Sequence, residues 1–234
     1  MVVHLDYRGA GKNFRRDIAV QTMTIEQLIS DAHELVQELL QRFNQQKILI
    51  MGQSFGATVG LRFAKLYPEL VYGFVGINQP VYRALEEKLS YEYVLEKARK
   101  MGDKKSLAQL TKIGSRRNGL YENENDLVTQ RKILTKLGGG AYKKNAFQFS
   151  VKYLWDEFMT INFFKEIPSI EVPVFFVMGQ HDKNCHNLVE EYYEKLQASH
   201  KELVIFDESA HLACFEEPEK FMDFMCNKVS TFCR

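Results

Sequence analysis

The five residues Gly52–Gly56, which read Gly-Gln-Ser-Phe-Gly, constrain the fold of this chain more than any other segment. They follow an apolar run, Lys47–Gly52, that predicts a buried strand, and they precede Ala57–Leu66, whose small and apolar residues predict a helix. A serine on a sharp turn between a strand and a helix exposes its hydroxyl, and glycines two positions before and after it relieve the crowding. Ser54 is therefore a candidate nucleophile. The alternative, in which Ser54 only caps the following helix, stays open on this motif alone.

Patterns typical of strands and of helices alternate along the chain. This alternation predicts an α/β fold with a mostly parallel sheet flanked by helices. A long stretch that is too charged and too helical to be sheet interrupts it. We therefore predict a core built from residues 1–80 and 167–234, with a helical cap formed by residues 81–166. The predicted strands are 2–5, 47–52, 71–77, 173–178 and 203–206, and the predicted helices outside the cap are 24–43, 57–66, 188–196 and 218–229.

The charge balance and the cysteines limit the partners and the compartment. Lys plus Arg number 31 and Asp plus Glu number 30, which gives a net charge of +1. This balance excludes a protein whose affinity for nucleic acid rests on a basic field. No apolar run is long enough to span a bilayer, no secretory signal is recognisable, and the four cysteines form no C-x-x-C pair, so we expect a cytoplasmic protein. We expect a small-molecule or short-peptide substrate, no nucleic acid and no membrane partner, and we leave a homodimer open.

Two loops further along the chain carry the partners that an activated serine needs. Asp182 follows the predicted strand 173–178, and His211 follows the predicted strand 203–206. The carboxyl ends of parallel strands lie at one edge of a sheet, where α/β proteins place their sites. We expect His211 to take the proton of Ser54, and Asp182 to fix the imidazole tautomer and stabilise its charged form.

Several neighbours compete with these assignments. The rival base is His181, and the rival acids are Asp207 and Glu208. His181 directly precedes Asp182, which suits an ordinary loop residue better than a base. The rival acids are so near His211 in sequence that they would have to bend back to reach it. The residues that suggest a metal instead are His181, Cys185, His186, His211 and Cys214. Zinc sites prefer tighter and more regular spacing, so we predict no metal.

Together these motifs resemble those of the α/β-hydrolase superfamily, and the resemblance covers the whole chain. The run Leu5–Gly11 resembles the Asp-x-Arg-Gly-x-Gly loop of the proline-iminopeptidase-like branch, and Gly179–Asp182 resembles the acid loop. Ser209–Leu212 and Glu216–Pro218 resemble the histidine loop and the start of its following helix. The resemblance implies that Gly52, Gln53 and Gly56 shape the elbow around Ser54, and that the backbone N–H of Phe55 contributes to the oxyanion hole. A serine at this position argues against dehalogenases and epoxide hydrolases of the same fold, which carry an aspartate there.

The sequence departs from this family at its start. Family members carry several strands and a His-Gly-Gly-type loop before the Asp-x-Arg-Gly-x-Gly segment, which here begins at Asp6. We therefore expect the chain to start midway through the fold and to lack one of two oxyanion donors, which lowers turnover by about 10²–10³-fold. We also expect Val2–Leu5 to move beside the strand Lys47–Met51. An open cleft, or pairing with a second chain, is the alternative.

The resemblance implies a serine hydrolase that cleaves an ester or amide through an acyl intermediate on Ser54, without a cofactor. It favours an aminopeptidase of the proline-iminopeptidase type. A small-molecule carboxylesterase is the first alternative, and a catalytically impaired remnant or interaction module is the second. Aromatic residues of the cap either pack on the core or line an apolar pocket above Ser54. Four acidic residues of the cap are candidates, by charge alone, for binding a free amino terminus: Glu86, Glu87, Glu92 and Glu96.

Overall fold

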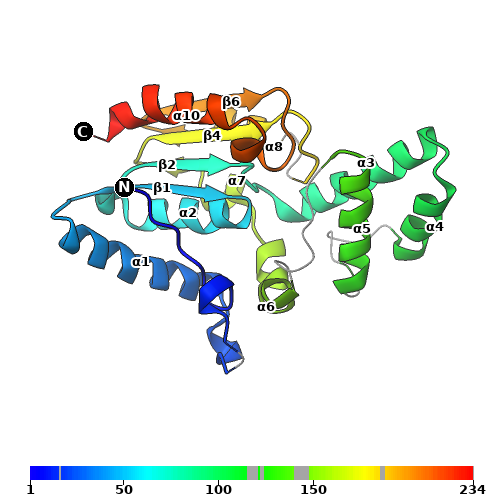
Figure 1. The fold of residues 1–234 in the computed structure, drawn as a ribbon, viewed down its shortest axis with the longest axis horizontal. Helices are drawn as coiled ribbons and strands as arrows, with labels where there is room; N and C mark the ends of the chain where they lie inside the picture. Colours follow the sequence, from blue (N-terminus) through cyan, green and yellow to red (C-terminus); the bar gives the residue numbers. More distant parts are fainter. Residues whose placement is uncertain (16, 115–120, 122–123, 140–147, 185–187, 234) are drawn as a thin grey trace.

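A computed structural model describes the chain except for residues 16, 115–120, 122–123, 140–147, 185–187 and 234. Its centre is a parallel sheet with the order β1-β2-β4-β6. The strands are β1 (Ile48–Gln53), β2 (Val71–Ile77), β4 (Val174–Gly179) and β6 (Lys201–Phe206). Their carboxyl ends all point toward the same side of the molecule (Figure 1). The predicted α/β fold with a mostly parallel sheet is confirmed.

Helices cover both faces of the sheet because the side chains of buried strands alternate between two apolar layers. On one face, Phe74 and Phe176 pack in the same cluster as residues of α1, α2 and α8. On the other, Val75 and Phe175 pack against α10 and the chain's last turn. The helices of the two layers are α1 (Ile25–Arg42), α2 (Phe55–Leu66), α8 (Leu188–Lys195), α9 (Ala213–Glu216) and α10 (Pro218–Asn227).

The local sequence explains where α1 begins. Thr24 has an extended backbone, and its hydroxyl accepts a hydrogen bond from the N–H of Gln27 at 3.1 Å. Such a cap satisfies one of the N–H groups that a helix leaves unpaired at its start. Leu28 and Val36 then point into the core. Short 3₁₀ turns connect several elements, at Gly11–Asn13, Val20–Thr22, Pro68–Leu70 and Val229–Phe232.

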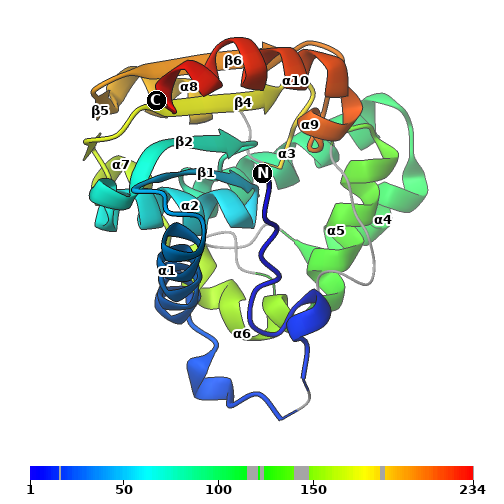
Figure 2. The same ribbon diagram turned by 60° about the vertical axis from the view of Figure 1, so that its left-hand side comes forward.

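Further helices leave the core after β2 and lie beyond the carboxyl ends of the strands (Figures 1 and 2). The chain leaves and returns at one narrow neck, where Tyr82 and Asn162 form an isolated antiparallel bridge. Beside it, Phe163 N donates to Val81 O at 2.8 Å. The helices beyond the strand ends are α3 (Arg83–Lys100), α4 (Lys104–Ile113) and α5 (Glu124–Lys136). The helix α6 (Gln148–Met159) lies beside α1, where Glu157 accepts from Ile25 N at 2.9 Å. After the neck, α7 (Phe163–Glu166) packs against α8 on the core, and a two-stranded sheet of β3 (Ser169–Ile170) and β5 (Gln197–Ala198) follows.

The expectation for the first residues is wrong. Val2–Leu5 is not a strand and forms no ladder with β1, which pairs only with β2 among the described residues. The segment passes near β1 in both views (Figures 1 and 2), but Val2 and Val3 stay exposed. The physical reason lies just downstream, where Arg8 binds Asp31 of α1 through two hydrogen bonds of 2.9 and 2.6 Å. This ion pair ties the segment to a helix rather than to the edge of the sheet.

No helix in the described part of the chain combines the length and the apolar character needed to cross a bilayer.

Candidate active site

The turn that carries Ser54 is sharp and strained. Ser54 has φ 52° and ψ −119°, in a region that non-glycine residues rarely occupy. Its N–H donates to Ile77 O at 2.9 Å, which fastens the turn to the end of β2. A Cβ on Gly52 would lie 2.3 Å from Gly56 O, so the turn closes only because Gly52 has no side chain. The strand-turn-helix context predicted for Ser54 is present.

The serine, the histidine and the aspartate meet at the carboxyl ends of three strands. His211 Nε2 lies 3.1 Å from Ser54 Oγ, and His211 Nδ1 lies 2.9 Å from Asp182 Oδ2. The two imidazole nitrogens therefore face the hydroxyl and the carboxylate separately. This arrangement permits the ring to receive a proton from Ser54 on one side while the carboxylate stabilises the resulting charge on the other.

The buried carboxyl group of Asp182 is held by more than the histidine. Its Oδ1 accepts from Asn184 N at 2.8 Å, and its Oδ2 accepts from Asn78 Nδ2 at 2.7 Å. Burial alone would raise the pKa of Asp182, but the attraction of His211 and these hydrogen bonds outweigh burial and lower that pKa below its ordinary value. The carboxylate is therefore charged at neutral pH, as an acid partner of the imidazole must be.

Asn78 is a site residue that the sequence analysis missed. It follows β2 directly, has φ 48°, and donates from Nδ2 both to Asp182 and to Ala210 O, the latter at 3.1 Å. Its position directly after a buried strand, at the sheet edge where α/β proteins place their sites, could have marked it as a candidate. Gln53, predicted as an elbow residue, donates from Nε2 to His211 O at 3.0 Å.

The rival residues lie elsewhere. His181 is exposed, and its backbone N–H donates to Ser209 O at 2.9 Å. Asp207 pairs with Lys220 at 3.0 Å. Cys185 and His186, named for the metal alternative, lie outside the described residues. Among the residues that are described, no group of three or more His, Cys, Asp or Glu side chains is arranged to hold a metal.

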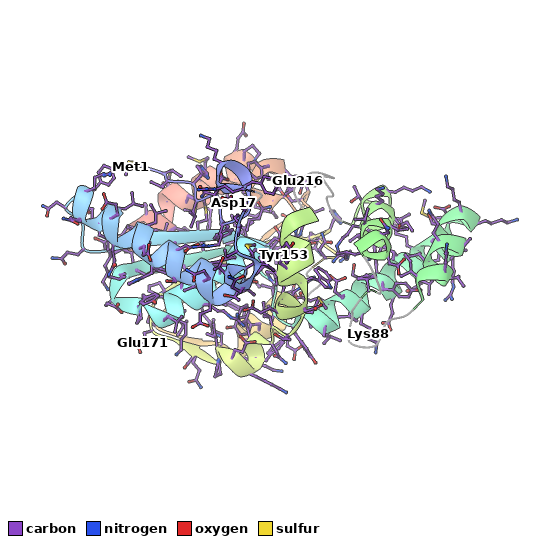
Figure 3. All side chains as sticks on the ribbon, turned by 90° about the horizontal axis from the view of Figure 1, so that it is seen from below. Met1, Asp17, Lys88, Tyr153, Glu171 and Glu216 are labelled. Atoms are coloured by element: carbon purple, nitrogen blue, oxygen red, sulfur yellow. The ribbon has the colours of Figure 1, made fainter. Side chains whose placement is uncertain are left out.

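Phe55 links the elbow to the N-terminal segment and to α6. Its ring lies edge-on to Tyr7 at 6.2 Å and to Phe158 at 5.2 Å, measured between centroids. As the first residue of α2, its N–H has no acceptor within the helix, so this donor is available beside Ser54. Phe158 is buried and Trp155 packs on it, so these two aromatics contribute to the core. In Figure 3, Tyr153 of α6 and Glu216 lie toward the end of the sheet where the cap begins.

The segment Leu5–Gly11 folds into a tight turn next to the elbow. Gly11 has φ 49°, and a Cβ there would lie 2.3 Å from the Asp6 carboxyl group. That carboxyl group accepts from Lys12 N at 3.0 Å. Burial raises the pKa of Tyr7 to about 12, which keeps its hydroxyl neutral beside Phe55.

Two of the acidic residues proposed for the cap are buried and already paired. Glu86 binds Arg83 at 2.5 Å, and Glu87 contacts both Arg83 and Arg131. Because arginine side chains already occupy these two carboxyl groups, neither is available to an incoming ammonium group in this arrangement. The remaining two, Glu92 and Glu96, are exposed on α3 and pair with Lys88 and Lys100.

Sequence comparisons match this chain to a known family and to two named proteins. The profile of the family described as serine aminopeptidase, S33, matches residues 1–218. The Bacillus subtilis protein named "Probable aminopeptidase YbaC" is 31% identical over 247 residues, covering 94% of this chain and 77% of that protein. Proline iminopeptidase of Saccharolobus solfataricus is 21% identical over 216 residues, covering 86% of this chain and 66% of that protein.

Solved structures show the same fold at lower sequence identity. Proline iminopeptidase of Mycobacterium smegmatis superposes with a TM-score of 0.62 at 13% identity, over 97% of this chain and 78% of that one. An esterase from Exiguobacterium antarcticum superposes with a TM-score of 0.55 at 18% identity, over 97% and 80% respectively.

Proposed function

The chain belongs to the serine aminopeptidase family S33, and from this premise we propose that Ser54, His211 and Asp182 carry its reaction. It is an α/β-fold serine hydrolase that cleaves an ester or amide bond. The observation that carries the proposal is the 3.1 Å contact between Ser54 Oγ and His211 Nε2 on a strained elbow. A serine that only capped a helix would not need either feature.

The proposed reaction has two halves. Ser54 Oγ attacks the substrate carbonyl carbon while its proton passes to His211 Nε2, and the Phe55 N–H stabilises the charge that forms on the carbonyl oxygen. His211 then protonates the leaving amine or alcohol, and the bond to it breaks, leaving an acyl group on Ser54. In the second half, water attacks this ester, again through His211, and releases the acid. Asp182 stays ionised throughout.

We propose an aminopeptidase that releases an N-terminal residue, because both curated relatives carry aminopeptidase or iminopeptidase in their names. A carboxylesterase is the second candidate, favoured by the fold shared with an esterase and by the lack of an uncompensated carboxylate among the four cap residues considered. Prolyl and alanyl p-nitroanilides, compared with p-nitrophenyl acetate, separate the two. An N-acetylated prolyl p-nitroanilide is the matched control, because an aminopeptidase must lose activity when the free amino group is blocked.

Labelling of Ser54 by a fluorophosphonate tests whether the chain is catalytic at all. We expect the wild-type chain to be labelled at Ser54 and Ser54→Ala not to be labelled, because only a serine activated by His211 attacks phosphorus quickly. A wild-type chain that reacts no faster than free serine would contradict the proposal and favour a non-catalytic interaction module.

We further propose that the protein works in a reducing compartment such as the cytoplasm. Cys214, Cys226 and Cys233 are all free thiols. Alkylation of the native protein under non-reducing conditions, followed by mass spectrometry, should find these three thiols modifiable after unfolding. A disulfide among them would contradict the proposal.

A further inference from the structure

The loop that carries His211 is held on its carbonyl side by the acid loop. Ser209 O accepts from His181 N at 2.9 Å, and Ala210 O accepts from Asn78 Nδ2 at 3.1 Å. A Cβ on Gly179 would lie 2.0 Å from Ala210 O, so the two loops touch backbone to backbone. These contacts fix where the carbonyl groups point. They leave the N–H groups of the same segment to be bound from the other side.

Two consecutive glutamates bind that other side. Glu216 Oε2 accepts from Ala210 N, the residue before His211, at 2.7 Å. Glu217 Oε2 accepts from Ser209 Oγ at 2.5 Å and from Glu208 N at 3.2 Å. Hydrogen bonds to carboxylates are shorter and stronger than those between neutral groups. The segment 208–210 is therefore clamped between the acid loop and two carboxylates.

Glu217 lies at the start of α10, where a side chain would normally bind its own helix. Glu217 is the N-cap residue of α10, yet its side chain accepts no capping hydrogen bond from that helix. A cap side chain normally binds the N–H groups of its own first turn. Here the carboxylate turns back to the loop instead, where Ser209 is fully buried and the Glu217 side chain is only 16% exposed. Its other oxygen, Oε1, lies 3.8 Å from Lys220 Nζ.

We propose that Glu217 and Glu216 are positioning residues that hold His211 in line with Ser54 and Asp182. The proposal rests on the function proposed above. The imidazole must meet two partners at once, at 3.1 and 2.9 Å, and a displacement of about 1 Å is enough to cost on the order of 10²-fold in rate. A loop bound only on its carbonyl side could rotate about that line of contacts, whereas one bound on both sides cannot.

The test compares Glu217→Ala, Glu217→Gln and Glu216→Ala with Glu219→Ala. Glu219 lies in the first turn of α10 but makes no hydrogen bond to the loop, so its variant removes a carboxylate from the same helix without touching the clamp. Turnover of p-nitrophenyl acetate is divided by the concentration of active sites, which is the amount of protein that the fluorophosphonate labels at saturation. We expect Glu217→Ala to lower kcat by about 10–100-fold with KM nearly unchanged. Glu217→Gln keeps an oxygen acceptor and should recover part of the loss.

A spectroscopic signal separates positioning from general destabilisation. The proton shared by His211 Nδ1 and Asp182 should give a downfield ¹H resonance in the wild type and in Glu219→Ala. In Glu217→Ala it should broaden or vanish at temperatures well below the unfolding midpoint. A Glu217→Ala variant that melts earlier but keeps wild-type kcat and this resonance would overturn the proposal. Absence of activity and labelling in the wild type would instead refute the proposed function.

Discussion

The two glycines that flank Ser54 are not equivalent, although the sequence motif treats them alike. A Cβ on Gly52 would meet the backbone of Gly56 and Ala57, whereas a Cβ on Gly56 would meet only the Tyr7 hydroxyl, at an ordinary 3.7 Å. The crowding at the elbow is therefore relieved on the strand side. Gly56, on the helix side, relieves little crowding, because a Cβ there would make only an ordinary contact.

This difference predicts unequal effects of the same substitution. Gly52→Ala should lower the free energy of unfolding by about 1–3 kcal/mol, the usual cost of overpacking, and should slow fluorophosphonate labelling of Ser54 by about 10²-fold. Gly56→Ala should leave the melting temperature within a few degrees of wild type. Thermal melts and labelling rates of the two variants, measured side by side, check this. Equal losses in both would show that the backbone clash is not what limits the elbow.

At the scale of elements, the apolar strands of the central sheet were predictable and the contacts of the first residues were not. The strand 71–77 lies where its apolar run predicts, and β1, β4 and β6 differ from prediction by at most two residues at either end. Val2–Leu5 has the same apolar character, but its placement depends on Arg8 and Asp31, which are 23 residues apart. The strands β3 and β5 have two residues each, too few for any period to show. The expectation that Ser54, Asp182 and His211 act together followed from strand order, whereas the donation from Asn78 to Asp182 requires two distant loops to meet.

The ion pair between Arg8 and α1 should control the mobility of the first residues. Arg8 and Asp31 are 32% and 24% exposed, whereas the similar pair Arg15–Asp17 is 73% and 71% exposed. We expect Arg8→Ala to raise amide hydrogen exchange in residues 2–12 while stability falls by only about 1 kcal/mol, because partly exposed ion pairs are weak. Arg15→Ala is the control and should change neither quantity. Unaltered exchange in Arg8→Ala would mean that the contact of Tyr7 with Phe55 holds the segment by itself.

At the scale of the whole molecule, one buried carboxyl group links pH to stability. Burial raises the pKa of Glu86 to about 7, an effect that outweighs the attraction of Arg83 and the hydrogen bonds from Val81 N and Tyr82 N. An unfolded glutamate titrates near 4.3. Between these values the folded chain keeps a proton that the unfolded chain has lost. The contribution of Glu86 to stability therefore falls as pH rises from about 4.3 to about 7, by roughly 4 kcal/mol at about 1.4 kcal/mol per unit of pKa.

Replacement of this carboxyl group should flatten the pH dependence. In Glu86→Gln the decline of the unfolding free energy between pH 5 and pH 8 should be smaller than in the wild type, as measured by chemical denaturation. Glu92→Gln, on the same helix but exposed, should follow the wild-type curve. Both variants keep the charged and polar groups around Glu86 and Glu87, which are Arg83, Arg131 and Tyr121. Parallel curves for all three proteins would show that Glu86 is ionised in the folded state.

The bridge between Tyr82 and Asn162 gives the chain a modular character. The 79 intervening residues start and finish within one hydrogen-bonded pair, and Arg83 N also donates to Ile161 O at 3.1 Å. Ser54 precedes this junction, while Asp182 and His211 follow it, and the pairing of β2 with β4 joins the two sides beneath it. Within this insertion, the described parts of α3, α4 and α5 share an apolar core of their own, whereas α6 packs on the main core and its Glu157 accepts from Ile25 N at 2.9 Å. A replacement segment whose ends lie equally close, and which keeps the contacts of α6, would leave the sheet and the residues Ser54, Asp182 and His211 in place.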